Sequence, residues 1–251
     1  MKDRQFVNAL ARGLELLKCF NPNDQYVGVS ELARRTGIPK PTVSRLAGTL
    51  SKLGYLEYSD SLGKYSLGIG VLALGHAKIA NLDVRSAARP LMEELAEYSQ
   101  ISVSIGMRHE LSMIYVDTVR SSAPISLQRG IGARLPIGTT SIGRAYICGA
   151  SDEERNEIFE GLQAKNKEDW VKIRDGIREA LKDYAKYGFC ISIGDWVTDI
   201  WAVGVPYKSP DGKLLSFNCG GPAFMLKEER LRNDIGPRLL EMVNKIKTIY
   251  K

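Results

Sequence analysis

Short polar and basic side chains gather at the start of one predicted helix. They are Lys40, Pro41, Thr42, Ser44 and Arg45. An arginine can bind guanine through two hydrogen bonds, and serine or threonine hydroxyls can donate to phosphates or base edges. In a helix-turn-helix, these positions of the second helix reach into the major groove. The residue types therefore predict sequence reading on duplex DNA, mainly by Thr42, Ser44 and Arg45.

Four further basic residues, Arg34, Arg35, Lys52 and Lys64, are placed to bind phosphates. The two arginines end the preceding predicted helix, Lys52 ends the reading helix, and Lys64 lies in a predicted hairpin. Phosphate contacts supply affinity and position rather than sequence information. The alternative is that Thr42 only caps a helix and that the arginines form a solvated face.

The spacing of apolar residues and the positions of glycine and proline predict the helices that position these side chains. An amphipathic helix begins near Phe6 and is ended by Asn21-Pro22. A second helix has Ser30 as its expected N-cap and ends at Gly37, and a third covers residues 42–53. Two helices joined by a tight turn containing glycine are typical of a helix-turn-helix.

A predicted β-hairpin follows directly, because residues 55–58 and 64–67 alternate with period two around a run of turn formers. This placement makes the hairpin the wing of a winged helix. Residues 1–68 contain ten Lys or Arg and six Asp or Glu, whereas the rest of the 251-residue chain contains 25 and 23. Most of the net charge of +6 therefore lies in about a quarter of the chain, as in a DNA-binding module.

The remaining chain reads as α+β. Two helices, at 68–81 and at 83–99 with an interruption or a kink at Pro90, meet at a predicted domain boundary. The predicted domains are a winged helix-turn-helix DNA-binding domain at 1–68, a linker helix at 69–82 and a second domain at 83–251. Strands are predicted at 101–107, 111–119, 125–129, 189–193, 200–207 and 214–219, and helices at 142–148, 152–161, 168–188 and 227–250. This order indicates a mostly antiparallel sheet flanked by helices.

One segment of the second domain has the features of an anion site. Glycines at 130–138 lead into Thr139, Thr140 and Ser141 and then an apolar helix. Hydroxyls and free N–H groups at a helix N-terminus favour a carboxylate or phosphate. The alternative is that the three hydroxyl residues merely cap the helix. A dinucleotide fingerprint is excluded because the third glycine is absent and no βαβ unit follows.

Other kinds of chemistry find little support. The four cysteines are far apart and His76 and His109 are the only histidines, so neither a zinc site nor a disulfide framework is expected. An enzyme is the weaker alternative, because no nucleophile motif lies near a histidine and Asp195 with Asp199 defines no geometry. No stretch of 18 uncharged apolar residues exists and no signal peptide is recognisable. We therefore expect a cytoplasmic protein with reduced thiols, no cofactor and no membrane partner.

A set of short motifs carries a likeness to one known family. In the first 68 residues the likeness rests on Ala11-Arg12-Gly13-Leu14, Val29-Ser-Glu-Leu-Ala33, Gly37-Ile-Pro-Lys-Pro-Thr-Val-Ser-Arg-Leu46, Leu53-Gly-Tyr-Leu56 and Tyr65-Ser-Leu-Gly68. Further on it rests on Leu72-Ala-Leu-Gly75, the linker pattern Asp83-Val-Arg-x-x-Ala-Arg-Pro-Leu91, Leu135-Pro136, Ser141-x-Gly-Arg-Ala145, Gly188-Phe189, Pro206 and Gly221-Pro222. By these motifs the chain resembles, over essentially its whole length, the IclR family of bacterial transcription regulators. Arg12, within the first motif, joins the predicted DNA contacts.

The resemblance implies a GAF-like effector domain after the winged helix, and dimers or dimers of dimers on palindromic operators. It implies a regulator, repressor or activator, that controls catabolic genes in response to a small organic acid. Leu72, Leu74, Ile79 and Leu82 are candidates for a dimer seam, with packing inside one subunit as the alternative. A DNA-binding architectural protein whose second domain only oligomerises is the other functional alternative.

The resemblance also implies an effector cavity between the sheet and the helix that begins at Ser141. Carried over position by position, its lining would be Leu127, Leu135, Ser141, Ile142, Ser192, Ile200, Ala202, Asn218 and Gly220, with Asp195 at the acidic position of the family's signature segment. Members that sense small keto acids tend to carry an acid where Ser192 stands, a cysteine at Ala202, and hydroxyls at Asn218 and Gly220. This chain has none of these, which argues against glyoxylate- or pyruvate-like effectors.

Two tryptophans, Trp196 and Trp201, lie close to this region in sequence. We interpret them as favouring a larger organic acid, with an aromatic acid as a candidate. Its carboxylate would bind at Ser141, its ring would lie near Trp196, and Asn218 would supply an amide. The alternative for both tryptophans is ordinary core or interface packing.

Overall fold

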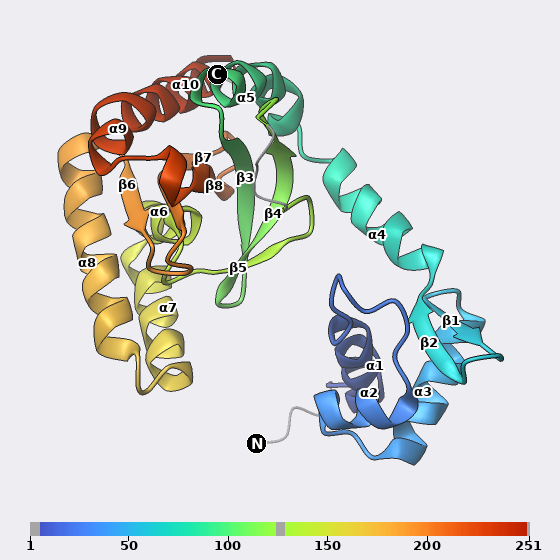
Figure 1. The fold of residues 1–251 in the computed structure, drawn as a ribbon. Coiled ribbons are helices and arrows are strands. Elements are labelled where there is room, and N and C mark those ends of the chain that lie inside the picture. The colour runs from blue at the N-terminus through green and yellow to red at the C-terminus, as the bar shows by residue number, and fades with distance from the viewer. Residues whose placement is uncertain (1–5, 124–128, 250–251) are drawn as a thin grey trace. The chain divides into compact units, whose positions relative to one another are not determined.

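The computed structural model describes residues 6–123 and 129–249, and the chain divides into two compact units at 1–82 and 83–251. Figure 1 shows helices and a hairpin in the first unit and a sheet with its helices in the second. The fold is α+β, as predicted.

The first unit is a winged helix. Its elements are α1 (Asn8–Lys18), α2 (Val29–Thr36), α3 (Lys40–Lys52), β1 (Leu56–Ser59), β2 (Lys64–Leu67) and α4 (Ile69–Ala80). The two strands form an antiparallel hairpin, to which a bridge between Val27 and Tyr65 adds a third segment. Apolar residues at helical spacing form one buried core: Leu16, Val27, Leu32, Ile38, Val43, Ala47 and Leu56. This core fixes α3 while leaving its opposite face to solvent.

The predicted helix starts need two corrections. Gly28, not Ser30, is the N-cap of α2, and Ser30 lies exposed inside its first turn. Helix α3 begins at Lys40 because Pro41 fits the first turn, where a backbone N–H has no partner within the helix. Thr42 therefore lies inside α3 and is not its cap. Gly37 ends α2 with a φ of 69°, as expected of a C-terminal glycine.

The second unit is built on one six-stranded antiparallel sheet in the order β5-β4-β3-β8-β7-β6. The strands are β3 (Ser102–His109), β4 (Ser112–Val119), β5 (Arg134–Pro136), β6 (Cys190–Ile193), β7 (Ile200–Lys208) and β8 (Leu214–Pro222). Strand β5 was expected to be a loop, since three residues are too short for a periodic signal. The predicted strand at 125–129 lies outside the described residues except for Arg129, which is not in a strand.

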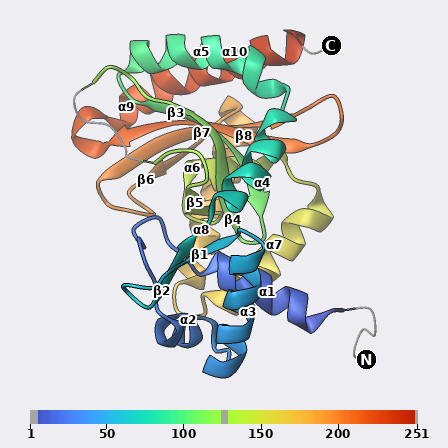
Figure 2. The ribbon, with the colours of Figure 1, turned by 90° about the vertical axis from the view of Figure 1, so that its right-hand side faces the viewer.

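Helices cover both faces of this sheet. On one face α5 (Val84–Ser99) and α10 (Gly236–Ile249) lie side by side, as Figures 1 and 2 show. On the other face α6 (Ser141–Gly149) packs on β7 and β8, with α8 (Trp170–Tyr187) against it and α7 (Asp152–Lys165) beside α8. The helix predicted at 227–250 is interrupted: a 3-10 turn (Ala223–Met225) and α9 (Glu228–Arg230) precede a π-helical turn (Leu231–Ile235). Pro237, which lacks an N–H, follows that turn.

A buried carboxylate ties the start of α5 to the sheet. The side chain of Asp117, on β4, is 1% exposed and accepts hydrogen bonds from Arg85 Nε at 3.2 Å and Arg89 Nη1 at 3.1 Å. The backbone N–H of Thr118 donates to it at 2.8 Å. Both arginines belong to the linker pattern, so the structure gives that pattern a physical role.

Two further findings concern the described part of the chain. None of its helices is long and apolar enough to cross a membrane. No group of three or more histidine, cysteine or acidic side chains within it is arranged to hold a metal ion.

Candidate DNA interface and effector site

Helix α3 separates an apolar face from a polar one. Val43 and Ala47 are buried in the core of the first unit, whereas Lys40, Ser44 and Arg45 are exposed. Pro41 is exposed as well, and Thr42 is half-buried. The residues that sequence analysis assigned to base reading therefore share one accessible end of a helix. Nothing in the packing of the unit requires their polar groups.

Among the predicted DNA contacts, five cations are exposed and form no ion pair with any described residue: Arg12, Lys40, Arg45, Lys52 and Lys64. They lie on α1, α3 and the hairpin. An exposed cation without an internal partner remains available for a phosphate, and its counterions can be released when one binds. These five residues are the electrostatic part of the candidate interface.

Arg34 and Arg35 are engaged differently from the other predicted phosphate contacts. Arg34 binds Glu31 at 2.6 Å. Arg35 binds Glu31 at 2.7 Å, pairs with Asp24, and donates to the Cys19 carbonyl at 3.0 Å. These hydrogen bonds from Arg34 and Arg35 lower the pKa of Glu31 to about 2. Hydrogen bonding, first of all from Arg35, also holds the pKa of Asp24 well below its usual range.

Arg35 is therefore less available to a phosphate than the other predicted contacts. Its guanidinium joins α2 to the connection between α1 and α2, and two carboxylates already neutralise the local charge. Breaking those contacts to reach DNA would leave Asp24 without its cationic partner, and Glu31 with Arg34 alone, beside the phosphate backbone. Asp24 lies eleven residues before Arg35, in a connection whose course the sequence pattern does not specify. Arg34 is exposed, and Glu31, which it shares with Arg35, is its only ion-pair partner among the described residues.

In the second unit, the register of the sheet brings distant residues into one row. Ser192 pairs with Ala202, and Ala202 pairs with Gly220, so three neighbouring strands place these positions side by side. Asn218 lies two residues before Gly220 and hence on the same face. The small side chains leave a hollow under the N-terminus of α6. A Cβ at Gly220 would lie 2.6 Å from that of Ala202, so the hollow depends on glycine there.

A small cavity of about 30 Å³ occupies this hollow. That volume suits one water molecule. The cavity is lined by Tyr115, Arg129, Leu135, Thr140, Ser141, Ser192, Trp196, Ile200, Ala202, Asn218 and Gly220. The Arg129 guanidinium lies over the Trp196 ring, 5.2 Å from its centroid. One cation and one aromatic face therefore meet at the same site.

The polar groups of the cavity are partly unsatisfied. Thr140 caps α6, accepting from the Gly143 N–H at 3.3 Å and donating to the Pro136 carbonyl at 2.7 Å. The adjacent Ser141 Oγ is buried and has no hydrogen-bond partner, and neither has Asn218 Oδ1. The residues Thr139, Thr140 and Ser141 were interpreted either as a helix cap or as part of an anion site. Both interpretations have structural support, because Thr140 is the cap and the Ser141 hydroxyl remains available to a ligand. Buried polar atoms without partners are rare and expensive, so two in one cavity indicate a site for a bound molecule.

Tyr115 completes the polar lining. Its hydroxyl accepts a hydrogen bond from Asn218 Nδ2 at 3.1 Å. This bond fixes the orientation of the amide, and Asn218 Oδ1 is left without a hydrogen-bond partner. Burial raises the pKa of Tyr115, so the phenol stays protonated and can act as a neutral donor.

Most of the predicted effector residues line this cavity, namely Leu135, Ser141, Ser192, Trp196, Ile200, Ala202, Asn218 and Gly220. Ile142 does not: it packs in the core, against Gly106. Leu127 lies outside the described residues. Sequence reasoning missed Tyr115 and Arg129, and it named Thr140 only among the hydroxyl residues before the helix. Alternation along β4 offered a signal for Tyr115, whereas nothing local distinguishes Arg129 from a solvated arginine.

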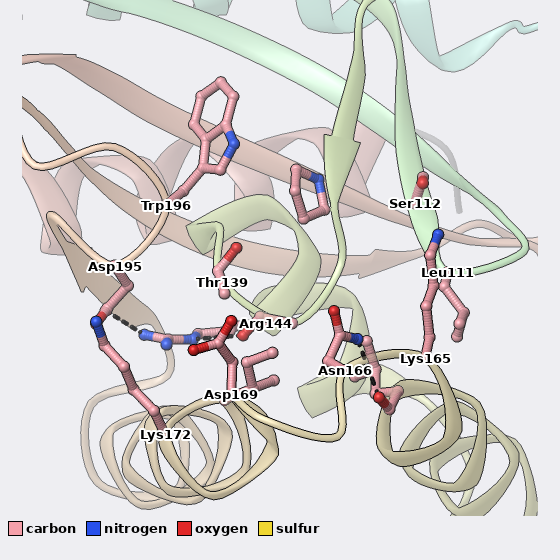
Figure 3. Close-up of a pocket in the computed structure, with 14 residues that line it drawn as sticks. Leu111, Ser112, Thr139, Arg144, Lys165, Asn166, Asp169, Lys172, Asp195 and Trp196 are labelled. Carbon is pink, nitrogen blue, oxygen red and sulfur yellow. Dashed lines mark hydrogen bonds and ion pairs between the residues drawn. The ribbon is translucent and has the colours of Figure 1, made fainter.

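Asp195, the acidic position of the signature segment, does not line the small cavity. It binds Arg144 Nη1 at 2.7 Å, and Arg144 Nε donates to the Gly138 carbonyl at 3.1 Å, as Figure 3 shows. The Arg144 side chain is 4% exposed, so Asp195 compensates a buried charge. Ser192 Oγ donates to the Thr139 carbonyl at 2.8 Å from the other side. The segment before α6 is therefore held by hydrogen bonds on both sides.

Comparisons with known proteins agree over both units. The family model described as the IclR helix-turn-helix domain matches residues 9–60, and that of the bacterial transcriptional regulator IclR C-terminal domain matches residues 76–248. The HTH-type transcriptional regulator TsaQ1/TsaQ2 of Comamonas testosteroni is 33% identical over 245 residues, covering 96% of this chain and 87% of that protein. These relatives are regulators and not enzymes.

Solved structures give the same result. An IclR family transcriptional regulator from Brucella abortus is 46% identical, with a TM-score of 0.92, over 100% of this chain and 95% of that one. An IclR homologue from Microbacterium hydrocarbonoxydans, crystallised with 4-hydroxybenzoate, is 21% identical, with a TM-score of 0.75, over 96% of this chain and 98% of that one.

Proposed function

Because this chain belongs to the IclR family of DNA-binding transcriptional regulators, we propose that it controls catabolic genes in response to a small organic acid. In this proposal residues 1–68 bind operator DNA, residues 69–82 link the units and help to join two copies, and residues 83–251 bind the effector and oligomerise. The protein works on DNA in the cytoplasm, as a repressor or an activator.

The unpaired cations of the first unit support the DNA contacts. Arg12, Lys52 and Lys64 are placed to neutralise phosphates, and Arg34 adds to them at the rim. Thr42, Ser44 and Arg45, with Lys40 and Pro41 at the helix start, face the bases in the major groove. Replacing Arg45 by alanine should then weaken specific binding by roughly 1–3 kcal/mol and relax discrimination. Equal preference of wild type and variant for cognate over random duplex would contradict that role.

The apolar surface of α4 supports pairing of two copies. Leu72 is 66% exposed and Leu74 is 59% exposed, whereas Ile79 is half-buried and Leu82 is buried. Leu72 and Leu74 are two positions apart and lie on different sides of α4, and exposed apolar side chains of this size on a helix call for a partner surface. Of the two alternatives for these residues, a dimer seam therefore suits Leu72 and Leu74, and packing inside the subunit suits Leu82. A symmetric pair would place two α3 helices on half-sites about 34 Å apart or a multiple of it, hence on a palindrome.

The observation that carries the effector proposal is the pair of unpartnered buried atoms, Ser141 Oγ and Asn218 Oδ1, in one cavity beside Arg129. A hydroxyl at a helix N-terminus and a nearby guanidinium favour a carboxylate. Trp196 supplies a flat apolar wall that suits an aromatic ring. The homologue crystallised with 4-hydroxybenzoate binds an acid of this kind, which supports the same class here. At about 30 Å³ the unliganded cavity must widen, and movement of Trp196 with Arg129 would widen it.

The effector would act by shifting a population. If it binds one arrangement of the paired units more tightly than another, it changes the spacing of the two α3 helices and so the operator affinity. The alternative, a purely architectural protein, would be favoured by an apolar cavity. Tyr115, Ser141, Ser192 and Asn218 make this cavity polar, which favours the sensor.

Thermal-shift titration with aliphatic and aromatic acids tests the proposal. An acid at a hundred times its Kd should add about 2.7 kcal/mol to the stability of the second unit. Ser141→Ala should remove that gain, while Ser216→Ala serves as the matched control, since it deletes a buried unpartnered hydroxyl outside the cavity. Both variants should be at least as stable as wild type without ligand. Full stabilisation of Ser141→Ala by the same acid, or stabilisation only by compounds without an anionic group, would refute the site.

Gel-shift titration on the DNA upstream of the protein's own gene tests the regulatory step. Binding should be sensitive to salt and should change when the stabilising acid is added. DNA binding that is indifferent to every stabilising acid would favour the architectural alternative.

A further inference from the structure

A second and larger pocket lies beside the effector cavity, on the other side of the segment that leads into α6. It has a volume of about 430 Å³ and is bordered by β4, the 136–139 segment, the ends of α7 and α8 that face each other, and the loop carrying Asp195 and Trp196. We call it the lateral pocket. This volume is in the range of small-molecule sites, whereas the effector cavity has room for one water.

The two ends of the lateral pocket each carry a lysine. Figure 3 shows Lys172, from the first turn of α8, on the side of Asp195, and Lys165, from the last turn of α7, on the side of Leu111 and Ser112. Neither ammonium group forms an ion pair within the described residues. Asp195 cannot serve them as a full countercharge, because it compensates the buried Arg144.

The middle of the lateral pocket combines apolar and polar side chains. Leu111, Leu162, Ile173 and Pro136 form its walls, with Trp196 at the upper edge. Asn166 and Asp169 lie between the two lysines in Figure 3. Asn166 Nδ2 donates to the Leu162 carbonyl at 2.9 Å, so its amide is fixed by the end of α7. A bound molecule would thus meet a cation at each end, and between them apolar walls with one amide and one carboxylate.

We propose that the lateral pocket binds an elongated organic dianion, a dicarboxylate with an apolar middle. Two separated ammonium groups match two carboxylates at the ends of one chain, and the apolar walls match the methylene or ring carbons between them. The carboxylate of Asp169 opposes this charge and sets the affinity below that of a purely basic site. Trp196 is the one residue that lines both the lateral pocket and the effector cavity, whereas the two lysines line only the lateral pocket, so this proposal does not depend on the proposed effector site.

Isothermal titration of the full chain with succinate, adipate and suberate, against hexanoate and inorganic phosphate, tests the inference. One of the dicarboxylates should bind about three- to tenfold more tightly than hexanoate, because the second carboxylate gains a charged hydrogen bond at a partly exposed site. Lys165→Gln and Lys172→Gln should each bring its affinity close to that of hexanoate. Asp169→Asn should raise the affinity, since it removes the opposing charge.

Two control variants keep the result specific. Lys167→Gln removes an exposed lysine of the same connection that does not line the lateral pocket, and it should leave binding unchanged. Ser141→Ala should also leave it unchanged, whereas loss of dicarboxylate binding in Ser141→Ala would place the ligand in the effector cavity and overturn the inference. Equal affinity for hexanoate and every dicarboxylate, or unchanged binding in both lysine variants, would overturn it as well. Far-ultraviolet circular dichroism of each variant confirms that it is folded.

Discussion

Removing the two arginines that hold Asp117 should destabilise the second unit far more than neutralising Asp117 itself. The Asp117 side chain is 1% exposed, whereas Arg85 and Arg89 are 23% and 50% exposed. In an Arg85→Ala/Arg89→Ala variant the carboxylate stays buried with only the Thr118 N–H as partner. An uncompensated buried charge of this kind costs about 3–5 kcal/mol.

Asp117→Asn should have a smaller effect. The amide oxygen can still accept from Thr118, and the two arginines are exposed enough to turn toward water. We expect a loss of about 1–2 kcal/mol, the usual value for weakened hydrogen bonds. Adding Asp117→Asn to the double arginine variant should then restore stability, because it removes the buried charge. The double arginine variant is therefore expected to be the least stable, because it leaves a buried charge, whereas Asp117→Asn leaves two arginines that water can reach.

Tryptophan fluorescence during urea unfolding measures this effect in the intact chain. All three tryptophans, Trp170, Trp196 and Trp201, lie in the second unit, so the signal reports on that unit without interference from the DNA-binding one. Arg178→Ala is the control, because its guanidinium is exposed and 3.9 Å from Asp175, and it should shift stability by less than about 0.5 kcal/mol. The reasoning is refuted if Asp117→Asn is as damaging as the double arginine variant.

Three further predictions concern other parts of the chain. Gly143→Ala places a Cβ 2.2 Å from the Ile137 carbonyl oxygen and should destabilise the second unit by about 3 kcal/mol in the same urea assay, so wild-type stability would contradict the packing under α6. Glu31, whose pKa is lowered to about 2, mainly by its hydrogen bond from Arg34, stabilises the first unit fully above its unfolded pKa of about 4.3 and progressively less as the pH falls toward 2. Helical circular dichroism from pH 6 to 2 should show this loss, and Glu31→Gln should lack that part of it. Burial raises the pKa of the Cys219 thiol to about 12, so iodoacetamide at pH 8 should modify it only after denaturation, and rapid labelling of the native protein, detected by mass spectrometry, would contradict that burial.

The helices of the first unit could be predicted because their signals are local. Gly37, the apolar spacing around Val43 and the hairpin at 56–67 each specify structure over a few residues. The fate of Arg35 could not be predicted, since its partner Asp24 is placed by the tertiary fold and not by any nearby pattern.

The effector cavity was accessible to sequence analysis mainly through the family resemblance. Ser192, Ala202 and Gly220 meet only when strand register is known, and no single strand reveals it. Alternation along β4 puts Tyr115 on a definite face but does not say what lies opposite. The lateral pocket was not anticipated at all, because it arises where the ends of α7 and α8 approach strand β4.

The short stretch between Pro136 and Ser141 is a wall common to two hollows. Its Thr139 side chain borders the lateral pocket, while its Thr140 and Ser141 side chains border the effector cavity. A molecule that strains this stretch from one side changes the shape offered to a molecule on the other. Thermodynamic reciprocity then requires that each occupant alter the affinity of the other by the same factor. The affinity of the protein for one metabolite would then depend on the concentration of the other.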